Sequence, residues 1–340
     1  MSTRLLALVA LLVGCSGRTT VGSDASIDPW VLDAPDLDVL DAGRCMIETI
    51  GDCAPVEGES TLFTADATSR IVAVRPPFVL LDPLRVVYVG SDGTGDTLTP
   101  RELDDSGLRA ISIALESAAK PFVLACGASA CRVFEVLTKD TPGLARVGPE
   151  LPATTRAIAV LDGKIWVAGD GVRRLDGATW SLERAEGRFH ALAAAFTDDG
   201  STVAAVGEGG VVAVRAHDAW TTTTAGVNDT LINVDLRDYV IAASSERGAL
   251  FLGTRSGFQP CTGPTLGVRS LSFVQGPWLR LLFGTTNDER SFTLDAAGAA
   301  CRSESIPGLR GGAMFSCGVS MNRWRFTATE LVGTYRCAIE

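Results

Sequence analysis

The chain has 340 residues, 46% of them hydrophobic, and its 40 acidic and 30 basic residues give a formal net charge of −10. An acidic chain without a basic stripe is poorly suited to nucleic acid or to electrostatic docking on anionic lipid, so we expect neither. The length suffices for one large all-β domain after an N-terminal leader.

Residues 1–14 have the layout of a secretory signal. Arg4 supplies a positive charge, an apolar run from Leu5 to Val13 follows, and Gly14 is a small residue at the cleavage zone. The apolar run has about half of the ~20 residues that a membrane-spanning helix requires. The pattern therefore predicts an exported protein whose leader is removed.

Cys15 follows this segment directly. The residues Leu12-Val13-Gly14-Cys15 resemble the lipobox of bacterial lipoproteins. The resemblance implies that the Cys15 thiol receives a diacylglyceryl group and becomes the new N-terminus, so that the mature protein is anchored to an envelope membrane. By the same resemblance, Ser16 at the next position favours the outer membrane. An ordinary signal peptide followed by an unrelated cysteine is the alternative.

Residues 15–43 form the next predicted segment, an acidic tether. Arg18 is its one basic residue, and Pro29 and Pro35 interrupt regular structure. Like charges at this density repel one another, so we expect an extended spacer that leads to a domain over residues 44–340. A calcium-binding string is disfavoured because the segment lacks the glycine turn and bidentate Glu of a calcium loop. The acidic residues are Asp24, Asp28, Asp33, Asp36, Asp38 and Asp41.

Eight further cysteines suit an exported protein with disulfides. No pair has the C-x-x-C spacing of a zinc site. Local spacing predicts one bond: Cys126 and Cys131 flank four small residues between two apolar runs, and a hairpin there would place their side chains opposite each other. The other pairings stay open. The eight are Cys45, Cys53, Cys126, Cys131, Cys261, Cys301, Cys317 and Cys337.

From about residue 60 onward, short runs of Val, Ile, Ala, Leu and Phe alternate with Gly/Asp/Ser turns at roughly ten-residue spacing, which indicates an all-β fold. Three consecutive segments repeat most clearly, each with four strands in a row. In each, a glycine opens the third strand and an aromatic residue follows nine or ten residues later. The pairs are Gly171 with Trp180, Gly210 with Trp220, and Gly248 with Phe258.

Weaker copies extend the repeat to seven units at a mean spacing of about 40 residues. Such units predict a β-propeller, because a four-stranded sheet covers both its faces only when neighbouring sheets stack against it. The last unit holds three strands, and we predict that Gly58–Ala65 supplies the fourth and closes the ring. A β-sandwich pair or a β-helix is the alternative. The expected first strands begin near Arg70, Arg109, Arg156, His190, Leu231, Arg269 and Gly312.

The segment 167–180 resembles the blades of WD40-like and photosystem-assembly-factor-like propellers. The run Val167-Ala168-Gly169-Asp170-Gly171-Val172 leads to Leu175-Asp176-Gly177-Ala178-Thr179-Trp180. The resemblance implies a propeller with variable loops at its two rims. The chain departs from WD40 proteins because it has no Trp-Asp dipeptide and no Gly-His pair. The segment Asp176–Trp180 is also one residue shorter than the Asp-box of sialidase-type propellers.

Candidate catalytic groups are few. The chain's two histidines, His190 and His217, have no accompanying Gly-x-Ser-x-Gly motif, so a Ser-His-Asp triad is not indicated and structural roles are expected. The turn pairs Asp104-Asp105 and Asp198-Asp199 are expected to be solvated. We therefore predict no catalytic residue and no cofactor.

The segment from Asp92 to Asp96 is a weak candidate for a metal site. Two carboxylates flank a glycine-rich backbone that could offer carbonyl ligands to calcium. A hairpin turn requires the same residues, since glycine adopts positive φ and Asp bonds to nearby amides. The hairpin turn is the favoured interpretation.

These patterns together predict a lipid-anchored, disulfide-containing propeller that acts as a non-catalytic binding or scaffolding module. The expected partner is an envelope protein or a glycan, bound at the rims or around the central channel. The alternative is a glycan-cleaving hydrolase or lyase, because propellers also host such chemistry. A cluster of Arg, Asp/Glu and Tyr at one channel mouth would favour the enzyme, and a broad apolar rim patch would favour the scaffold.

Overall fold

The computed structural model describes residues 60–338, apart from residues 76, 90–94, 106, 118–119, 139–141, 198–199, 238–239, 262–267, 274–280, 287–289, 296–302, 311–312, 318–319 and 327–328. All described residues belong to one of the two units into which the chain divides, Asp36–Glu340. No helix among them has the length and apolar content to cross a membrane. The predicted signal segment, Cys15, the tether and the domain start at residue 44 lie outside the described residues.

The described strands form antiparallel sheets in which most strands pair with the next one along the chain. The first blade comprises β2 (Arg70–Arg75), β3 (Phe78–Asp82), β4 (Arg85–Val89) and β5 (Gly95–Leu98), and the second β6 (Arg109–Ser117), β7 (Lys120–Cys126), β8 (Ala130–Leu137) and β9 (Gly143–Pro152). The third and fourth share β10 (Ala157–Leu161), β11 (Lys164–Asp176), β12 (Thr179–Thr197), β13 (Gly200–Gly207), β14 (Val211–Ala216) and β15 (Ala219–Thr224). The fifth comprises β16 (Leu231–Arg237), β17 (Val240–Ser245), β18 (Leu250–Thr254) and β19 (Gly257–Pro260), and the sixth β20 (Val268–Phe273), β21 (Leu281–Thr286), β22 (Arg290–Asp295) and β23 (Ser303–Arg310). The seventh comprises β24 (Ala313–Cys317), β25 (Ser320–Phe326), β26 (Glu330–Ala338) and β1 (Ser60–Thr64).

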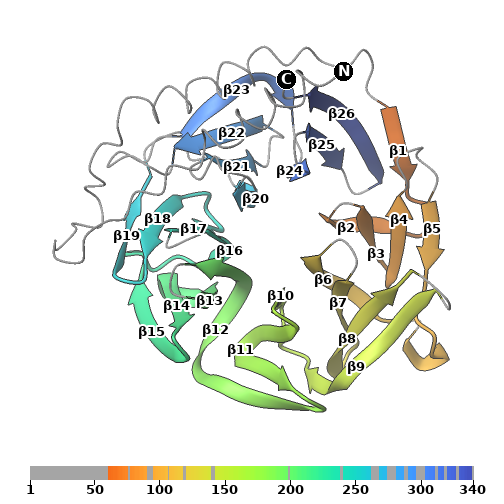
Figure 1. Cartoon of the computed structure of the whole chain (residues 1–340), viewed down its shortest axis with the longest axis horizontal. Helices are drawn as coiled ribbons and strands as arrows, with labels where there is room; N and C mark the ends of the chain where they lie inside the picture. Colours follow the sequence, from red (N-terminus) through yellow and green to blue (C-terminus); the bar gives the residue numbers. More distant parts are fainter. Residues whose placement is uncertain are drawn as a thin grey trace, which may run out of the picture. The chain divides into compact units, whose positions relative to one another are not determined.

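Within this unit the sheets stand around a central axis, with the first strand of each blade nearest the axis (Figure 1). This arrangement is a seven-bladed β-propeller, which confirms the fold class predicted from the repeat. Six of the seven expected first-strand starts are confirmed, and the exception is His190, which lies inside the continuous strand β12. Strands begin at Arg70, Arg109 and Leu231, and β10, β20 and β24 each begin one residue away from the expected position.

The ring closes as the sequence predicted. β1 pairs antiparallel with β26, and the sheet order β1-β26-β25-β24 makes the N-terminal strand the outermost strand of the last blade. The amide of Ala65 also donates to the carbonyl of Thr329 at 2.8 Å. Because residues distant in sequence complete one sheet, main-chain hydrogen bonds within the last blade join the N-terminal and C-terminal parts of the propeller.

The third and fourth blades differ from the prediction of separate four-stranded units. β12 runs without interruption over 19 residues. Its first half, up to Arg188, pairs with β11 as an outermost strand, and its second half, from Phe189, pairs with β13 as an innermost strand. Gly187, two residues before pairing with β13 begins, has φ 102°, a conformation in which glycine bends the chain without ending the strand. The two blades are therefore joined into one six-stranded sheet.

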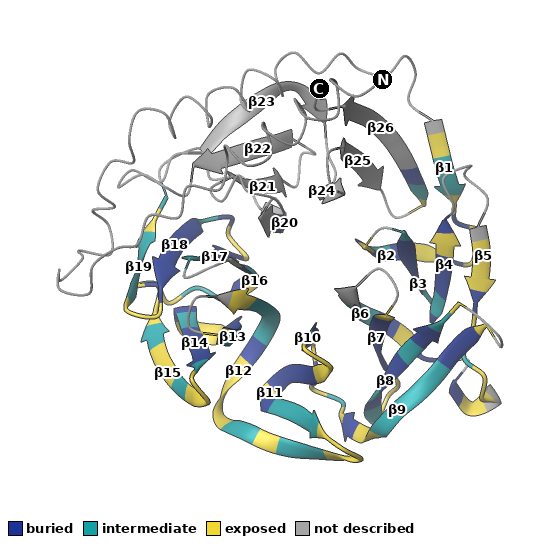
Figure 2. Cartoon of the chain, viewed as in Figure 1, coloured by how far each residue is buried: buried dark blue, intermediate teal, exposed yellow. Residues whose placement is uncertain are grey.

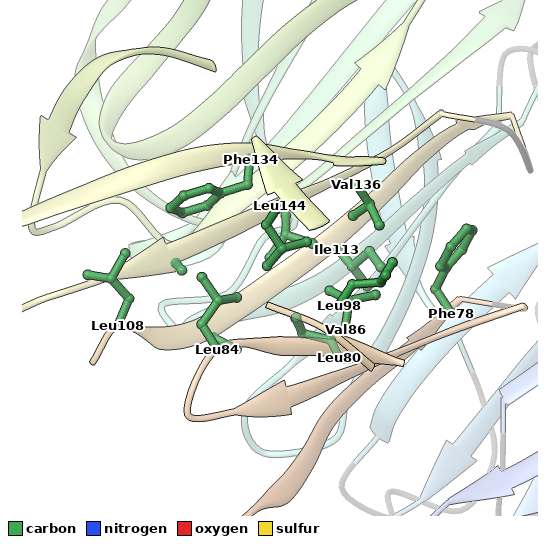
Figure 3. Packing of buried hydrophobic residues seen from close by; sticks show 13 residues of the cluster. Phe78, Leu80, Leu84, Val86, Leu98, Leu108, Ile113, Phe134, Val136 and Leu144 are labelled. Atoms are coloured by element: carbon green, nitrogen blue, oxygen red, sulfur yellow. The ribbon is translucent and has the colours of Figure 1, made fainter. Parts of the chain in front are cut away.

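The core lies between neighbouring blades. Buried positions concentrate on the second strands, such as β7 and β13, where almost every side chain is covered (Figure 2). Between the first two blades, Phe78 and Leu80 face Ile113 and Phe134 in one cluster (Figure 3). Each fully buried large side chain contributes about 1.5–3 kcal/mol relative to an exposed one. Continuous apolar runs in the sequence thus correspond to strands covered on both faces.

Candidate functional site

Arginines recur at one end of the ring. Strands within a blade are antiparallel and each blade is entered at its innermost strand, so the innermost strands run in one direction and begin at one end. We call that end the entry face. Four exposed arginines open or directly precede innermost strands there, and we call them the arginine arc: Arg70, Arg109, Arg156 and Arg188.

Arg70 and Arg109 share one carboxylate across the first two blades. The Nε of Arg70 and the Nη2 of Arg109 each lie 3.2 Å from Oδ2 of Asp82, the last residue of β3. The side chains of Arg70 and Arg109 remain 56% and 66% exposed, whereas that of Asp82 is 11% exposed. Each guanidinium has five N–H donors, so most of them point elsewhere than at Asp82. The three groups carry a net charge of +1.

A pocket of about 420 Å³ lies beside this group. Its lining is Ala67, Thr68, Ser69, Arg70, Asp82 and Pro83, and the peptide bond between the last two is cis.

The loop that forms the pocket's edge is organised by Asp66. Its Oδ1 accepts hydrogen bonds from the Thr68 hydroxyl at 2.7 Å, the Ser69 hydroxyl at 2.7 Å and the Thr68 amide at 2.9 Å. Its Oδ2 accepts from Nη2 of Arg85 at 3.0 Å. These bonds, with the Thr68 hydroxyl first, hold the pKa of Asp66 well below its usual range. Asp66 therefore stays ionised and fixes the loop at neutral pH.

Arg156 is the least neutralised member of the arc. Its Nη1 donates to the carbonyls of Ala153 at 3.0 Å and Thr155 at 3.2 Å, and no carboxylate of a described residue lies within ion-pair distance. Its amide donates to the carbonyl of Ala168 at 2.7 Å. A Cβ on Gly169 would lie 2.4 Å from the Thr154 carbonyl, so only glycine allows this loop to lie so close to β11.

Arg188 lies in a more acidic setting. Its Nε is 3.3 Å from Asp170 and its Nη1 is 3.7 Å from Glu208, whose Oε1 is also 3.9 Å from Nε2 of His190. A Cβ on Gly207 would lie 1.8 Å from the Arg188 carbonyl. Gly207, like Gly169, thus makes room for a backbone segment beside an arc arginine.

The turn acids Asp104 and Asp105 differ from the prediction of a solvated pair. Asp105 is 1% exposed and forms an ion pair with Nη1 of Arg132, which also lies 3.6 Å from Asp104. Nη2 of Arg132 binds Glu150 at 2.7 Å, and this bond raises the pKa of Arg132 and lowers that of Glu150. Carboxylates of Glu102, Asp104 and Asp105 lie within 4.8 Å of one another, but Arg132 already supplies the positive charge. The prediction was wrong for Asp105 because burial requires a partner from β8, which local sequence does not reveal.

Cys126 and Cys131 are directly opposite each other in the β7–β8 hairpin and form a disulfide with an S–S distance of 1.98 Å. Their sulfur atoms lie 3.7 and 3.8 Å from the carbonyl of Thr155, so the bond packs beneath the loop that carries Arg156. Cys261 is disulfide-bonded as well. Export of the protein and the remaining cysteine pairings stay predictions.

The remaining predicted groups are dispersed. Asp92 lies outside the described residues, and Asp96 is an exposed residue of β5 opposite Tyr88. His217 occupies the turn between β14 and β15 with φ 48°. Tyr88 packs on Phe78 with ring centroids 5.5 Å apart. Asp198 and Asp199 also lie outside the described part of the chain.

The repeat positions of the arginines carry a signal for the arc in the sequence. Arg70, Arg109 and Arg156 occupy three consecutive expected strand starts. A basic residue at the same position of successive repeats predicts a basic line at one rim, but only after the direction of the innermost strands is known. The face offers exposed guanidinium groups, two-point hydrogen-bond donors suited to carboxylate or phosphate.

No family model matches the chain, and no curated protein matches it. Solved structures do. A structure titled YCF48 bound to D1 peptide has 12% identity and a TM-score of 0.58, covering 85% of this chain and 98% of that one. YCF48 from Cyanidioschyzon merolae has 10% identity and a TM-score of 0.58, with 82% and 98% covered. Raptor from Chaetomium thermophilum has 14% identity and a TM-score of 0.50, with 77% of this chain and 26% of that one covered. At these identities the likeness establishes the fold: the chain is a β-propeller similar to YCF48 and Raptor.

Proposed function

We propose that this chain is a non-catalytic binding module, lipid-anchored at the bacterial outer membrane, whose entry face receives an acidic segment of an envelope protein. The observation that carries the proposal is the arginine arc. Three of its members open consecutive blades, remain exposed, and share only one carboxylate among them: Arg70, Arg109 and Arg156. On a chain of net charge −10, such a local excess of positive charge favours an anionic partner.

A protein segment suits the face better than a glycan does. The residues lining the pocket beside Arg70 include no aromatic side chain on which a sugar ring could stack. The arc extends from the first blade to the fourth, so an extended peptide with several carboxylates could contact more than one of its arginines. A propeller of similar fold, YCF48, has been solved with a D1 peptide bound, which gives a precedent for peptide binding by this fold.

The glycan-cleaving alternative has one feature in its favour, the convergence of Arg70, Asp82 and Arg109 at one end of the ring. Tyr88, however, packs on Phe78 within its own blade. Asp66 and Asp82 are both held by arginines, and the lowered pKa of Asp66 makes it a poor proton donor. Binding without chemistry is therefore the function that the geometry supports best.

The binding face is tested by comparing two double variants in proximity crosslinking of the intact, lipidated protein in its own cells. Arg109→Gln with Arg156→Gln removes two entry-face charges. Lys120→Gln with Lys164→Gln removes two exposed charges from the far ends of the β6–β7 and β10–β11 hairpins in the same blades. Each surface ion pair contributes up to about 1 kcal/mol, so we expect about tenfold weaker capture of the dominant partner by the arginine variant alone. Equal loss in both variants would refute the entry face as the site.

The anchor is tested separately. Cys15→Ala should move the protein from the membrane fraction to the soluble fraction after detergent-free lysis, because the lipid has no other attachment point in the proposed maturation. Cys15→Ser is not a useful control, since it also removes the thiol. The matched control is Ser16→Ala, which leaves Cys15 in place and should stay membrane-bound. Continued membrane association of Cys15→Ala would refute lipid anchoring at this residue.

A further inference from the structure

His190 has an unusual environment on the entry face. It lies on β12 two residues after Arg188, and its Nε2 atom is inaccessible to solvent and has no hydrogen-bond partner among the described residues. A carboxylate oxygen, Oε1 of Glu208, lies 3.9 Å from Nε2. A neutral imidazole carries no charge and gains little from a carboxylate at this distance, whereas the protonated ring is attracted to it.

The charged groups around His190 come from several elements. β11 contributes Asp170 and the turn before β14 contributes Glu208, while β12 itself contributes Arg188. β16, which packs against β12, and the loop before it carry two further acids, Asp235 and Asp229. Asp229 lies 3.7 Å from Arg247, and Asp235 acts on the buried Arg75 of β2. With His190 neutral, the group of Arg188, Asp170, Glu208 and His190 has a net charge of −1. Protonation of His190 brings that charge to zero.

We infer that His190 makes the entry face pH-sensitive, so that the arc binds an acidic segment more tightly as pH falls. This inference rests on the proposed function. With His190 neutral, the two negative charges of Asp170 and Glu208 exceed the one positive charge of Arg188. This part of the entry face then repels a negatively charged partner. Protonation cancels that excess and engages Glu208, leaving Arg188 freer to bind the partner.

Thermodynamic linkage sets the direction in which the affinity for the acidic segment changes with pH. Binding of an anionic segment stabilises the charged form of the imidazole, and by reciprocity the charged form raises the affinity for the segment. Histidine ionises between about pH 5 and 8, a range in which Asp side chains of a bound peptide stay ionised. Affinity should therefore rise as pH is lowered through this range.

The test is fluorescence anisotropy of a dye-labelled hexa-aspartate peptide with the full propeller at low salt, at about pH 8 and about pH 6. One added charge at a partly exposed site should tighten wild-type binding about three- to fivefold at the lower pH. His190→Gln should abolish this difference, and His190→Lys should bind at the higher pH as tightly as wild type does at the lower one. His217→Asn is the matched control, because His217 is the only other histidine and Asn tolerates its positive φ.

Each outcome has a definite meaning. Loss of the pH effect in His190→Gln, with its retention in His217→Asn, would support the inference. Retention of the full pH effect in His190→Gln, or pH-independent binding by wild type, would overturn it while leaving the proposed function intact. Absence of wild-type binding at both pH values would overturn the acidic-segment proposal, and this inference with it.

Discussion

At two places in this propeller, two arginines share one carboxylate and so connect neighbouring blades. The two places differ mainly in how far the arginine side chains are buried. Arg70 and Arg109 share Asp82 across the first and second blades, with the arginine side chains 56% and 66% exposed. Arg174 and Arg215 share Glu183 across the third and fourth, at 3.2 and 3.1 Å, with side chains only 23% and 5% exposed. We call these the exposed set and the buried set.

The difference in burial predicts a structural role for the buried set and leaves the exposed set available for the proposed partner. In the buried set the guanidinium of Arg215 has lost its water and depends on Glu183 and on Asp218, at 2.6 Å, for compensation. In the exposed set Asp82 is as buried as Glu183, but both arginine side chains stay in water, where screening keeps the contribution of the ion pairs to folding small. Its donors remain accessible, which suits them to a partner.

Of the substitutions that test these two sets, Gly207→Ala should lower the free energy of unfolding most. The new Cβ would lie 1.8 Å from the carbonyl of Arg188, so either β13 or β12 must move. Because β12 also carries Glu183, the change should disturb the buried set and the arc together. We expect a loss of about 3 kcal/mol or more in the free energy of unfolding, measured by urea denaturation.

Gly177→Ala is its control. Gly177 has φ 60°, but no atom of a described residue beyond its chain neighbours lies within 4 Å of the position that a Cβ would take. Only backbone strain of about 1 kcal/mol is therefore expected. Equal destabilisation by the two substitutions would mean that the close approach at Arg188 does not matter for stability.

A smaller effect is expected from removing the bridging acid of each set. Glu183→Gln leaves Arg215 buried with Asp218 as its one charged partner among the described residues, and should lower the free energy of unfolding by about 2–3 kcal/mol. Asp82→Asn should lower it by less than about 1 kcal/mol. Parallel urea titrations of the two variants give the comparison directly. Similar losses, or a larger loss for Asp82→Asn, would contradict the assignment of separate roles.

Local features were predictable because they depend on residues close in sequence. The alternation of apolar runs and Gly/Asp/Ser turns indicated the strands, and the repeat indicated their grouping into blades. Cys126 and Cys131 were paired correctly in position because a four-residue turn fixes the register of a hairpin. The closing strand was predictable because the last repeat was one strand short.

Contacts between blades were not predictable in the same way. Asp105 and Arg132 are 27 residues apart, and Glu183 and Arg215 are 32 apart, so no local pattern announces either pair. The continuity of β12 was missed as well, since Gly187 is equally compatible with a turn and with a bend in a strand.

The sequence by itself therefore determined the strand pattern, the forty-residue repeat, the ring closure and the hairpin cysteines, because backbone preference and alternating burial act over short distances. Only the tertiary structure decided which charges are buried, that the third and fourth blades share one sheet, and that arginines from separate repeats meet on one face. The physical reason is that radial stacking brings residues from different blades together, and their burial and pairing depend on that packing rather than on neighbours in the chain.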